Sequence, residues 1–338
     1  MPSQNHYYIM KRLIFSISIA LSLITLSIAG CSSAAKSNQN AAEAESADAA
    51  MPAADFNADS AYAFVEAQCA FGPRVPGSDA HSRCGDYLVH QLKKYGAIVT
   101  EQKAKLKAFD GTTLNMRNII ASYNPNAEKR ILLLAHWDCR PWADSDADPA
   151  NHALPVMGAN DGASGVGVLL EIARALQARQ AQVGVDILLV DDEDWGSHDG
   201  NEESWALGSQ YWTKNMHIKG YRPAFGILLD MVGAYGAKFY QEYYSTAYAQ
   251  SVVTEVWNIA HRLGYGAMFP KEQGGGITDD HVFVNRAEIP CIDIIDMRPG
   301  TEHGFFPHWH TTADTMQNID PATLKAVGSV VLTLIYSM

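Results

Sequence analysis

Short apolar runs that end in acidic residues or histidines constrain the fold of this chain more than any other feature. The run over residues 131–135 leads directly to His136 and Asp138, and the run over 185–190 leads to four consecutive carboxylates. Unbroken aliphatic runs of this length are typical of strands that are buried on both faces of a parallel sheet. In open α/β sheets, functional residues lie at the carboxyl ends of such strands. We therefore expect a polar site at one edge of a buried sheet.

Helical and extended patterns alternate along the rest of the chain. Apolar residues at helical spacing predict helices over 59–69, 78–95, 164–176, 251–263 and 322–336. Alternating or continuous apolar residues predict strands over 96–109, 117–123, 131–135, 185–190, 225–229 and 291–295. This order predicts a single α/β domain with a mixed, mostly parallel central sheet and helices on both faces.

The first residues have the pattern of a secretory signal rather than of a folded domain. Lys11 and Arg12 precede an apolar stretch over 13–29, and Cys31 follows soon after it. This ending is similar to that of bacterial lipoprotein signals, in which the cysteine is lipidated and becomes the mature amino terminus. The alternative is a signal peptide that is cut elsewhere. We predict a lipoprotein signal peptide over 1–31.

The next segment has the composition of a tether. Residues 32–55 consist mainly of Ala, Ser, Asn and Glu, which predicts a flexible linker, and the folded domain is expected over 56–338. Together with the signal, this predicts a protein of the bacterial cell envelope that is lipid-anchored and either faces the periplasm or is exposed at the surface.

The charge of the chain restricts its partners. The formal net charge is −12. Surfaces that bind nucleic acid or anionic lipid are basic, so this charge argues against both partners and leaves the lipid anchor as the membrane contact.

The cysteines outside the signal allow two interpretations. Cys69 and Cys84 either pair as a disulfide in an oxidising envelope or stay free. Cys139 and Cys291 lie beside predicted strand ends and are expected to be structural.

The polar residues at the strand ends are of the types that bind Zn²⁺. His136 and Asp138 lie two residues apart on an extended segment, so both side chains leave the same face and the carboxylate can orient the imidazole, either as a ligand or behind one. Asp161 lies in a turn of small residues before a helix. It is either the cap of that helix or a metal ligand, and its small neighbours allow a metal to approach closely.

Further carboxylates and a histidine complete a possible metal site. Glu193 and Asp194 belong to the four adjacent carboxylates, whose packing is costly unless a cation or protons offset the charge. One of two consecutive carboxylates can hold a metal while its neighbour transfers protons. Asp230 ends another apolar run. A set of Asp161, Asp194 and His310 would leave one open position, which is the pattern of a catalytic zinc site.

Six segments, in their order and spacing, resemble one protein family. HWD, GANDGAS, DDEDWG, LLDMVG, TDDHVFVNRAEIPCIDII and WHT are similar to segments of the M28 zinc aminopeptidase superfamily, and in particular of its glutaminyl cyclase branch. The resemblance covers residue 56 to the carboxyl end. The lipoprotein signal and the GASG sequence resemble a bacterial-type enzyme of this branch.

The resemblance implies a role for each polar residue of these segments. It implies that Asp161, Asp194 and His310 hold a single Zn²⁺ and that Glu193 is the general base and acid. From the sequence alone, Asp279 either begins a helix or has a functional role. The resemblance implies that Asp230 and Asp279 hydrogen-bond with Glu193 and the substrate amine, and that Trp309 walls the pocket.

Two positions depart from the family pattern. Asp194 stands where the family has a glutamate, so the metal is expected to lie slightly deeper. Asp199 stands where the animal enzymes have a tryptophan, and Trp195 or Trp205 is expected to supply that wall instead.

The resemblance implies zinc-dependent cyclisation of the N-terminal glutamine of peptides and proteins to pyroglutamate, with release of ammonia. One alternative is an M28-type aminopeptidase with two zinc ions, in which His136, Asp161 and Asp230 form the second metal site. A further alternative is a catalytically inactive, lipid-anchored binding protein. The presence of every expected ligand together with Glu193 argues against this last alternative.

Overall fold

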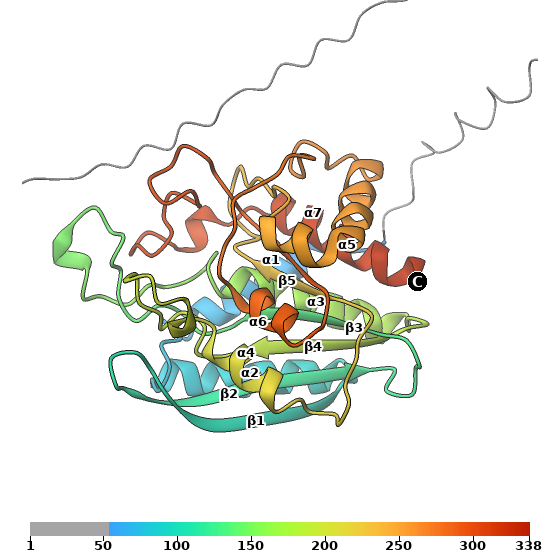
Figure 1. Cartoon of the computed structure of the whole chain (residues 1–338), viewed down its shortest axis with the longest axis horizontal. Coiled ribbons are helices and arrows are strands. Elements are labelled where there is room, and N and C mark those ends of the chain that lie inside the picture. Colours follow the sequence, from blue (N-terminus) through green and yellow to red (C-terminus); the bar gives the residue numbers. More distant parts are fainter. Residues whose placement is uncertain (1–53) are drawn as a thin grey trace, which may run out of the picture. The chain divides into compact units, whose positions relative to one another are not determined.

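Six strands form one sheet within residues 54–338, which are the residues that this computed structural model describes. The predicted signal peptide, its Cys31 and nearly all of the predicted linker lie outside the described residues. The strands are β1 (Ile98–Lys107), β2 (Thr113–Tyr123), β3 (Arg130–His136), β4 (Gly184–Val190), β5 (Gly226–Asp230) and β6 (Cys291–Ile295). Their order in the sheet is β1-β2-β4-β3-β5-β6 (Figure 1).

The sheet is mixed, and its central part is parallel. β1 pairs with β2 and β2 with β4 in antiparallel fashion, whereas β3 is parallel to both β4 and β5, and β5 is parallel to β6. The predicted fold class, a single α/β domain with a mixed and mostly parallel sheet, is therefore confirmed.

Helices cover both faces of this sheet. They are α1 (Ala58–Cys69), α2 (Asp79–Lys94), α3 (Ala163–Ala178), α4 (Leu207–Lys214), α5 (Tyr243–Arg262), α6 (Asp280–Arg286) and α7 (Pro321–Ser337). In Figure 1, α4 and α6 lie in front of the strands and α2 lies behind β2. Helix α4 does not appear among the elements expected from sequence, α6 was expected only as one of the two interpretations of Asp279, and α5 begins earlier than expected.

The strand β3 shows why its sequence is apolar at every position. Leu133 packs into the larger core together with α1, α3 and α7. Leu134, the next residue, points to the other face and packs with Trp212 of α4 and Val284 of α6. Because alternate side chains of a strand face opposite sides, a strand covered on both sides needs a continuous aliphatic run.

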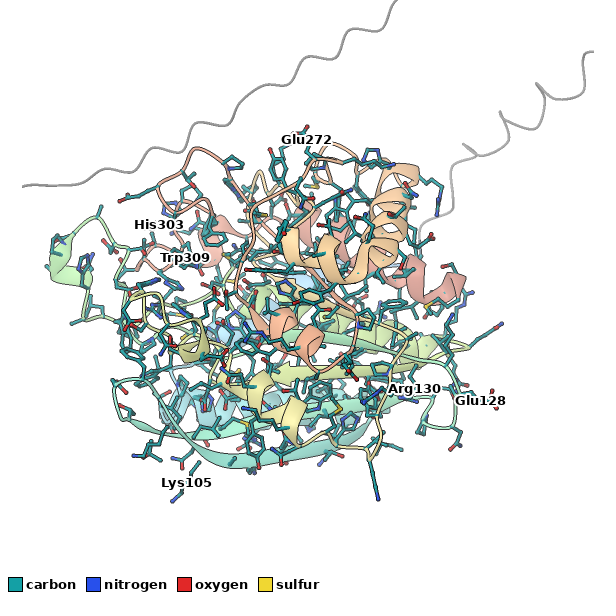
Figure 2. The ribbon with its side chains drawn as sticks, viewed as in Figure 1. Lys105, Glu128, Arg130, Glu272, His303 and Trp309 are labelled. Carbon is teal, nitrogen blue, oxygen red and sulfur yellow. The ribbon has the colours of Figure 1, made fainter. Side chains whose placement is uncertain are left out.

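The parallel strands all end at the same edge of the sheet. In Figure 2, Arg130, the first residue of β3, lies at the opposite side of the molecule from Trp309. The loops that follow β3, β4 and β5 therefore leave the sheet on the side where Trp309 and its neighbours lie, as expected for a site at the carboxyl ends of strands.

Two further observations bear on the sequence-based predictions. All four cysteines of the described residues are free, so Cys69 and Cys84 do not pair. Among the helices of residues 54–338, none has the length and apolar character needed to cross a membrane.

Candidate active site

The side chains of Asp161, Asp194 and His310 converge at this edge of the sheet. Nε2 of His310 lies 3.0 Å from Oδ1 of Asp194 and 3.5 Å from Oδ2 of Asp161. One ligand atom from each of the three lies within 4.8 Å of the others, and all three residues are buried. One imidazole nitrogen and two carboxylate oxygens from separate segments form a donor set that fits Zn²⁺ with a further position open.

Asp161 does not cap the helix that follows it. The N-cap of α3 is Gly162, which makes no side-chain cap bond, so the capping interpretation is wrong. The backbone N–H of Asp161 instead donates to Oδ2 of Asp314 at 3.0 Å. Gly162 has φ 101° and lies so close to the carbonyl oxygen of Asp138 that a Cβ would stand 2.4 Å from it. These contacts leave the carboxylate of Asp161 facing the cluster.

The four consecutive carboxylates after β4 do not all lie at the metal-binding cluster. Asp138 accepts the backbone N–H of Glu193 and that of Asp194, each at 3.2 Å, and so holds these two residues at the site. Asp191 turns away, since its carboxylate lies 2.7 Å from Nε2 of His81. Both carboxylate oxygens of Asp138 are therefore engaged by this backbone, which places Asp138 behind the expected metal ligands.

His136 lies beside the same cluster. Its Nε2 is 3.0 Å from Oδ1 of Asp161 and 3.3 Å from Oδ1 of Asp230, and its Nδ1 is 3.5 Å from Oδ1 of Asp138. His136, Asp161 and Asp230 thus form a second group that could hold a metal ion. The geometry alone keeps both a one-metal and a two-metal site open.

A cavity of about 220 Å³ opens onto the metal-binding cluster. Its polar lining includes Glu193, Asp230 and Asp279 besides the three expected ligands. Its apolar lining comes from the following side chains: Trp205, Met231, Ile277, Ile295, Phe305 and Trp309. The structure therefore brings together every residue that the sequence placed at the metal and at the reacting groups.

The tryptophans divide between the cavity and its surroundings. Trp205 and Trp309 line the cavity, but Trp195 does not. The ring of Trp195 packs edge-on against Trp142, with 5.5 Å between centroids, and its Nε1–H donates to Oδ2 of Asp110 at 3.3 Å. Trp195 therefore does not form the expected wall of the cavity, because the loop after β4 directs its ring toward Trp142, and Trp205 lies at the wall instead.

The segment beside Asp199 contributes a residue that the sequence did not single out. His198 lines the cavity, and its ring lies 5.1 Å from that of Trp205 and 5.7 Å from that of Trp309 between centroids. Asp199 itself is not among the lining residues. A histidine thus stands next to the position at which animal-type enzymes are expected to have a tryptophan.

Asp279 combines the two roles that its sequence left open. It is the N-cap of α6, because its Oδ1 accepts the backbone N–H of Asp280. Its Oδ2 is buried and has no hydrogen-bond partner among the described residues. One oxygen therefore caps the helix while the other remains available at the cavity.

Burial dominates the titration of the carboxyl groups that line the cavity. It raises the pKa of Glu193 well above its usual value, and the charges of Asp279 and Asp194 add to this effect. Burial likewise raises the pKa of Asp230 to about 7. Strongly raised pKa values are typical of carboxyl groups that act as general bases and acids.

The two histidines have opposite electrostatic environments. Burial, together with the charge of Arg140, places the pKa of His310 well below its usual value, so its ring is neutral. Burial also disfavours a charged His136, but the neighbouring carboxylates of Asp138, Asp161 and Asp230 outweigh it and raise its pKa. A metal ligand must be a neutral imidazole, so His310 has the required state.

Comparison with known proteins agrees with this geometry. Residues 118–335 match the profile described as peptidase family M28. The crystal structure of Bacteroides thetaiotaomicron glutaminyl cyclase bound to N-acetylhistamine is 52% identical, with a TM-score of 0.83 over 85% of this chain and 100% of that chain. Porphyromonas gingivalis glutaminyl cyclase is 56% identical, with a TM-score of 0.81 over 82% and 97% of the two chains.

A third solved relative bears a different description. A Zn-dependent exopeptidase from Parabacteroides distasonis is 51% identical, with a TM-score of 0.83 over 85% of this chain and 100% of that chain. The chain is therefore similar, over nearly the whole length of each relative, to proteins described as glutaminyl cyclases and to one described as an exopeptidase.

Proposed function

The chain belongs to peptidase family M28, and we propose that it cyclises the N-terminal glutamine of peptides and proteins to pyroglutamate and releases ammonia. The observation that carries this proposal is that Glu193, Asp230 and Asp279 line one small cavity together with the metal-binding cluster. The similarity to two solved glutaminyl cyclases, which the chain matches over 100% and 97% of their lengths, supports it.

Asp161, Asp194 and His310 are the residues that would hold a single Zn²⁺. Their donor atoms, burial and mutual distances fit this ion. When bound there, Zn²⁺ would supply Lewis-acid polarisation of the γ-carbonyl of the glutamine.

Glu193 would move the proton of the reaction. Its carboxylate accepts a proton from the α-amine of the substrate as the amine nitrogen bonds to the γ-carbon. The same carboxyl group then donates that proton to the amide nitrogen as the bond between this nitrogen and the γ-carbon breaks and ammonia leaves. The raised pKa of Glu193 suits a group that must first accept a proton and then release it.

The remaining lining residues would position the substrate. Asp230 and Asp279 would accept hydrogen bonds from the α-amine, and Trp205 and Trp309 would form the walls that keep bulk water away from it. Because the attacking nitrogen already belongs to the substrate, the protein contributes mainly position and charge, and no water molecule needs to be activated.

We further propose that the protein is anchored to a bacterial membrane through a lipid on Cys31. The sequence of the first 31 residues supports this, since it resembles a lipoprotein signal. Expression in a Gram-negative host tests the proposal. The full chain should fractionate with membranes, and Cys31→Ala should not. Equal fractionation of both proteins would contradict it.

The aminopeptidase with two zinc ions is the second candidate. The proximity of His136, Asp161 and Asp230 favours it, because these residues could hold the second ion. Metal analysis of the purified domain separates the two candidates: one zinc per chain fits the cyclase, and two, with one lost in His136→Ala, fit the peptidase.

The proposed activity is tested by incubating the domain with a peptide that begins with glutamine and measuring ammonia. We expect ammonia release from wild type and release that is slower by about 10²–10⁴-fold from Glu193→Gln. Absence of both ammonia and free amino acid with the zinc-loaded protein would instead favour a binding protein.

A further inference from the structure

A buried arginine and its carboxylate partner lie directly behind the expected metal ligands. Asp144 follows β3 in the loop that also carries Arg140. The guanidinium of Arg140 donates two hydrogen bonds to the carboxylate of Asp144, from Nε to Oδ1 at 2.8 Å and from Nη2 to Oδ2 at 2.5 Å. Neither residue is among those that the sequence placed at the site.

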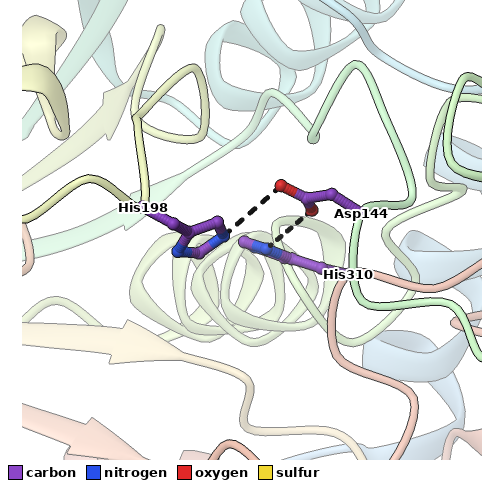
Figure 3. Close-up of side chains that lie close together, drawn as sticks. All are labelled: Asp144, His198 and His310. Carbon is purple, nitrogen blue, oxygen red and sulfur yellow. Dashed lines mark ion pairs between the residues drawn. The ribbon is translucent and has the colours of Figure 1, made fainter.

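The carboxylate of Asp144 also faces the imidazole of His310 (Figure 3). Nδ1 of His310 lies 3.6 Å from Oδ1 of Asp144, whereas Nε2 faces Asp194 at 3.0 Å. Nδ1 is buried and accepts or donates no hydrogen bond among the described residues, so the carboxylate of Asp144 at 3.6 Å is the charged group that faces it. A histidine that binds a metal through Nε2 carries its proton on Nδ1, and a carboxylate facing Nδ1 favours that tautomer.

The backbone of His310 needs support as well. Its φ is 52°, in the left-handed region that residues other than glycine rarely adopt, so surrounding contacts must hold it there. The loop of Asp144 provides them. The backbone N–H of Ser145 donates to the carbonyl oxygen of His310 at 3.1 Å. Asp146 accepts the backbone N–H of Thr312 at 3.0 Å and its hydroxyl at 2.6 Å.

Arg140 links this support to a second ligand. Its Nη1 donates to the backbone oxygen of Asp194 at 2.9 Å and to that of Gly196 at 3.2 Å. Its guanidinium also lies over the ring of Trp205, 4.9 Å from the centroid. One buried cation thus contacts the segment of Asp194, the carboxylate behind His310 and a wall of the cavity.

We propose that Arg140 and Asp144 are positioning residues that set the affinity of the metal site, by holding the ring of His310 in the tautomer and orientation that a metal requires. The inference rests on the metal site of the proposed function. It concerns binding of the ion and not the reaction, so zinc affinity tests it independently of the substrate.

The decisive comparison is the zinc affinity of Asp144→Asn, measured by competition with a chelator of known affinity. Losing a partner behind a ligand typically costs about 10–100-fold in metal affinity, and we expect a loss of this size. Asp148→Asn is the matched control, because Asp148 is exposed on the same loop and should leave the affinity unchanged. Equal affinities of Asp144→Asn and wild type, or an equal loss in the control, would overturn the proposal.

Two readouts separate positioning from a general loss of structure. The zinc-free proteins should unfold at similar temperatures, whereas the absorption spectrum of the cobalt-substituted protein should change in Asp144→Asn because the ring of His310 is reoriented. If Asp144→Asn does not fold, Asp144→Glu keeps the charge but shifts the carboxylate. It should show a smaller loss of affinity and an altered cobalt spectrum, and an unaltered spectrum and affinity would contradict the proposal.

Two further outcomes are informative. Asp144, His198 and His310 could themselves hold an ion. Loss of one of two bound zinc ions in Asp144→Asn, with the other unweakened, would therefore overturn the positioning role. His310→Ala must lower the affinity more than Asp144→Asn. If it does not, the metal site of the proposed function is wrong, whereas tight zinc binding without cyclisation would contradict only the reaction.

Discussion

Nε2 of His310 lies 3.0 Å from Oδ1 of Asp194, and both side chains are buried. Burial places the pKa of His310 well below its usual value and that of Asp194 well above it, so neither group carries its charge easily in this position. A divalent cation between them would compensate the carboxylate and use the lone pair of the neutral ring.

Removal of the metal should destabilise the folded domain. An ion that binds only the folded state adds about 2.7 kcal/mol when its free concentration is 100 times the dissociation constant. We expect a strong chelator to lower the unfolding temperature and zinc to restore it, as measured by scanning calorimetry. His310→Ala is the control, because its unfolding temperature should not respond to zinc. An equal zinc response in both proteins would contradict the ligand assignment.

Glu193→Gln should abolish proton transfer without removing the metal. The substitution keeps the size of the side chain but cannot accept the proton of the α-amine. We expect kcat to fall by about 10²–10⁴-fold while the zinc content stays that of wild type. Glu202→Gln, at an exposed position on the same segment, should keep full activity. A Glu193→Gln enzyme with wild-type kcat would exclude this residue as the base.

Glu242 should make the stability of the domain depend on pH. Its carboxylate accepts the backbone N–H groups of Tyr244 and Ser245 and lies 3.1 Å from Nε2 of His281. Burial alone would raise the pKa of Glu242, but these partners outweigh it and hold the pKa below its usual value. A carboxyl whose pKa is lower in the folded state stabilises the protein above its unfolded pKa, and this stability is lost as the pH falls through the folded value.

We therefore expect Glu242→Gln to reduce the free energy of unfolding by about 1.5–3 kcal/mol at neutral pH. The difference from wild type should shrink as the pH falls below about 4.5, since protonation removes the same charge from wild type. Urea unfolding at a series of pH values measures both effects. Glu255→Gln, at an exposed position of α5, should follow the wild-type curve. A difference that grows on acidification would refute this role for Glu242.

All four cysteines of the described residues should react as free thiols. Burial raises the pKa of Cys84 to about 12, and the thiolate is the reactive form, so this thiol should react very slowly at neutral pH and faster as the pH rises. A chromogenic disulfide reagent should detect four thiols in the unfolded domain without prior reduction. Only two thiols in the unfolded, unreduced domain would indicate the disulfide between Cys69 and Cys84 that the structure does not contain.

The buried strands were predictable because their signal is local. The aliphatic residues of β3 are needed on both faces of the sheet, and a run this short is more typical of a buried strand than of a helix. Helix α4 gives a weaker signal. It has only eight residues, and it follows Ala206, whose left-handed backbone conformation cannot be predicted from the sequence. Its position depends on contacts with β2 and α6 rather than on its own pattern.

The residues of the site likewise include some that the sequence predicts and some that it does not. The convergence of Asp161, Asp194 and His310 was predictable because each directly follows or precedes a recognisable segment and the segments resemble one family. Arg140 and Asp144 were not, since both lie in a loop whose path is fixed by contacts with Thr312 and the backbone of His310. The outward turn of Trp195 was equally hidden, because it depends on Trp142 and Asp110 from other loops.

The most direct test of the whole account is the mass of the product formed from a peptide that begins with glutamine. The zinc-loaded domain should convert the peptide to a species lighter by one ammonia, with every residue of the chain retained, because the α-amine attacks the γ-carbon of its own residue. A product that lacks the first residue, accompanied by free glutamine, would contradict cyclisation and show that the site hydrolyses the peptide bond instead.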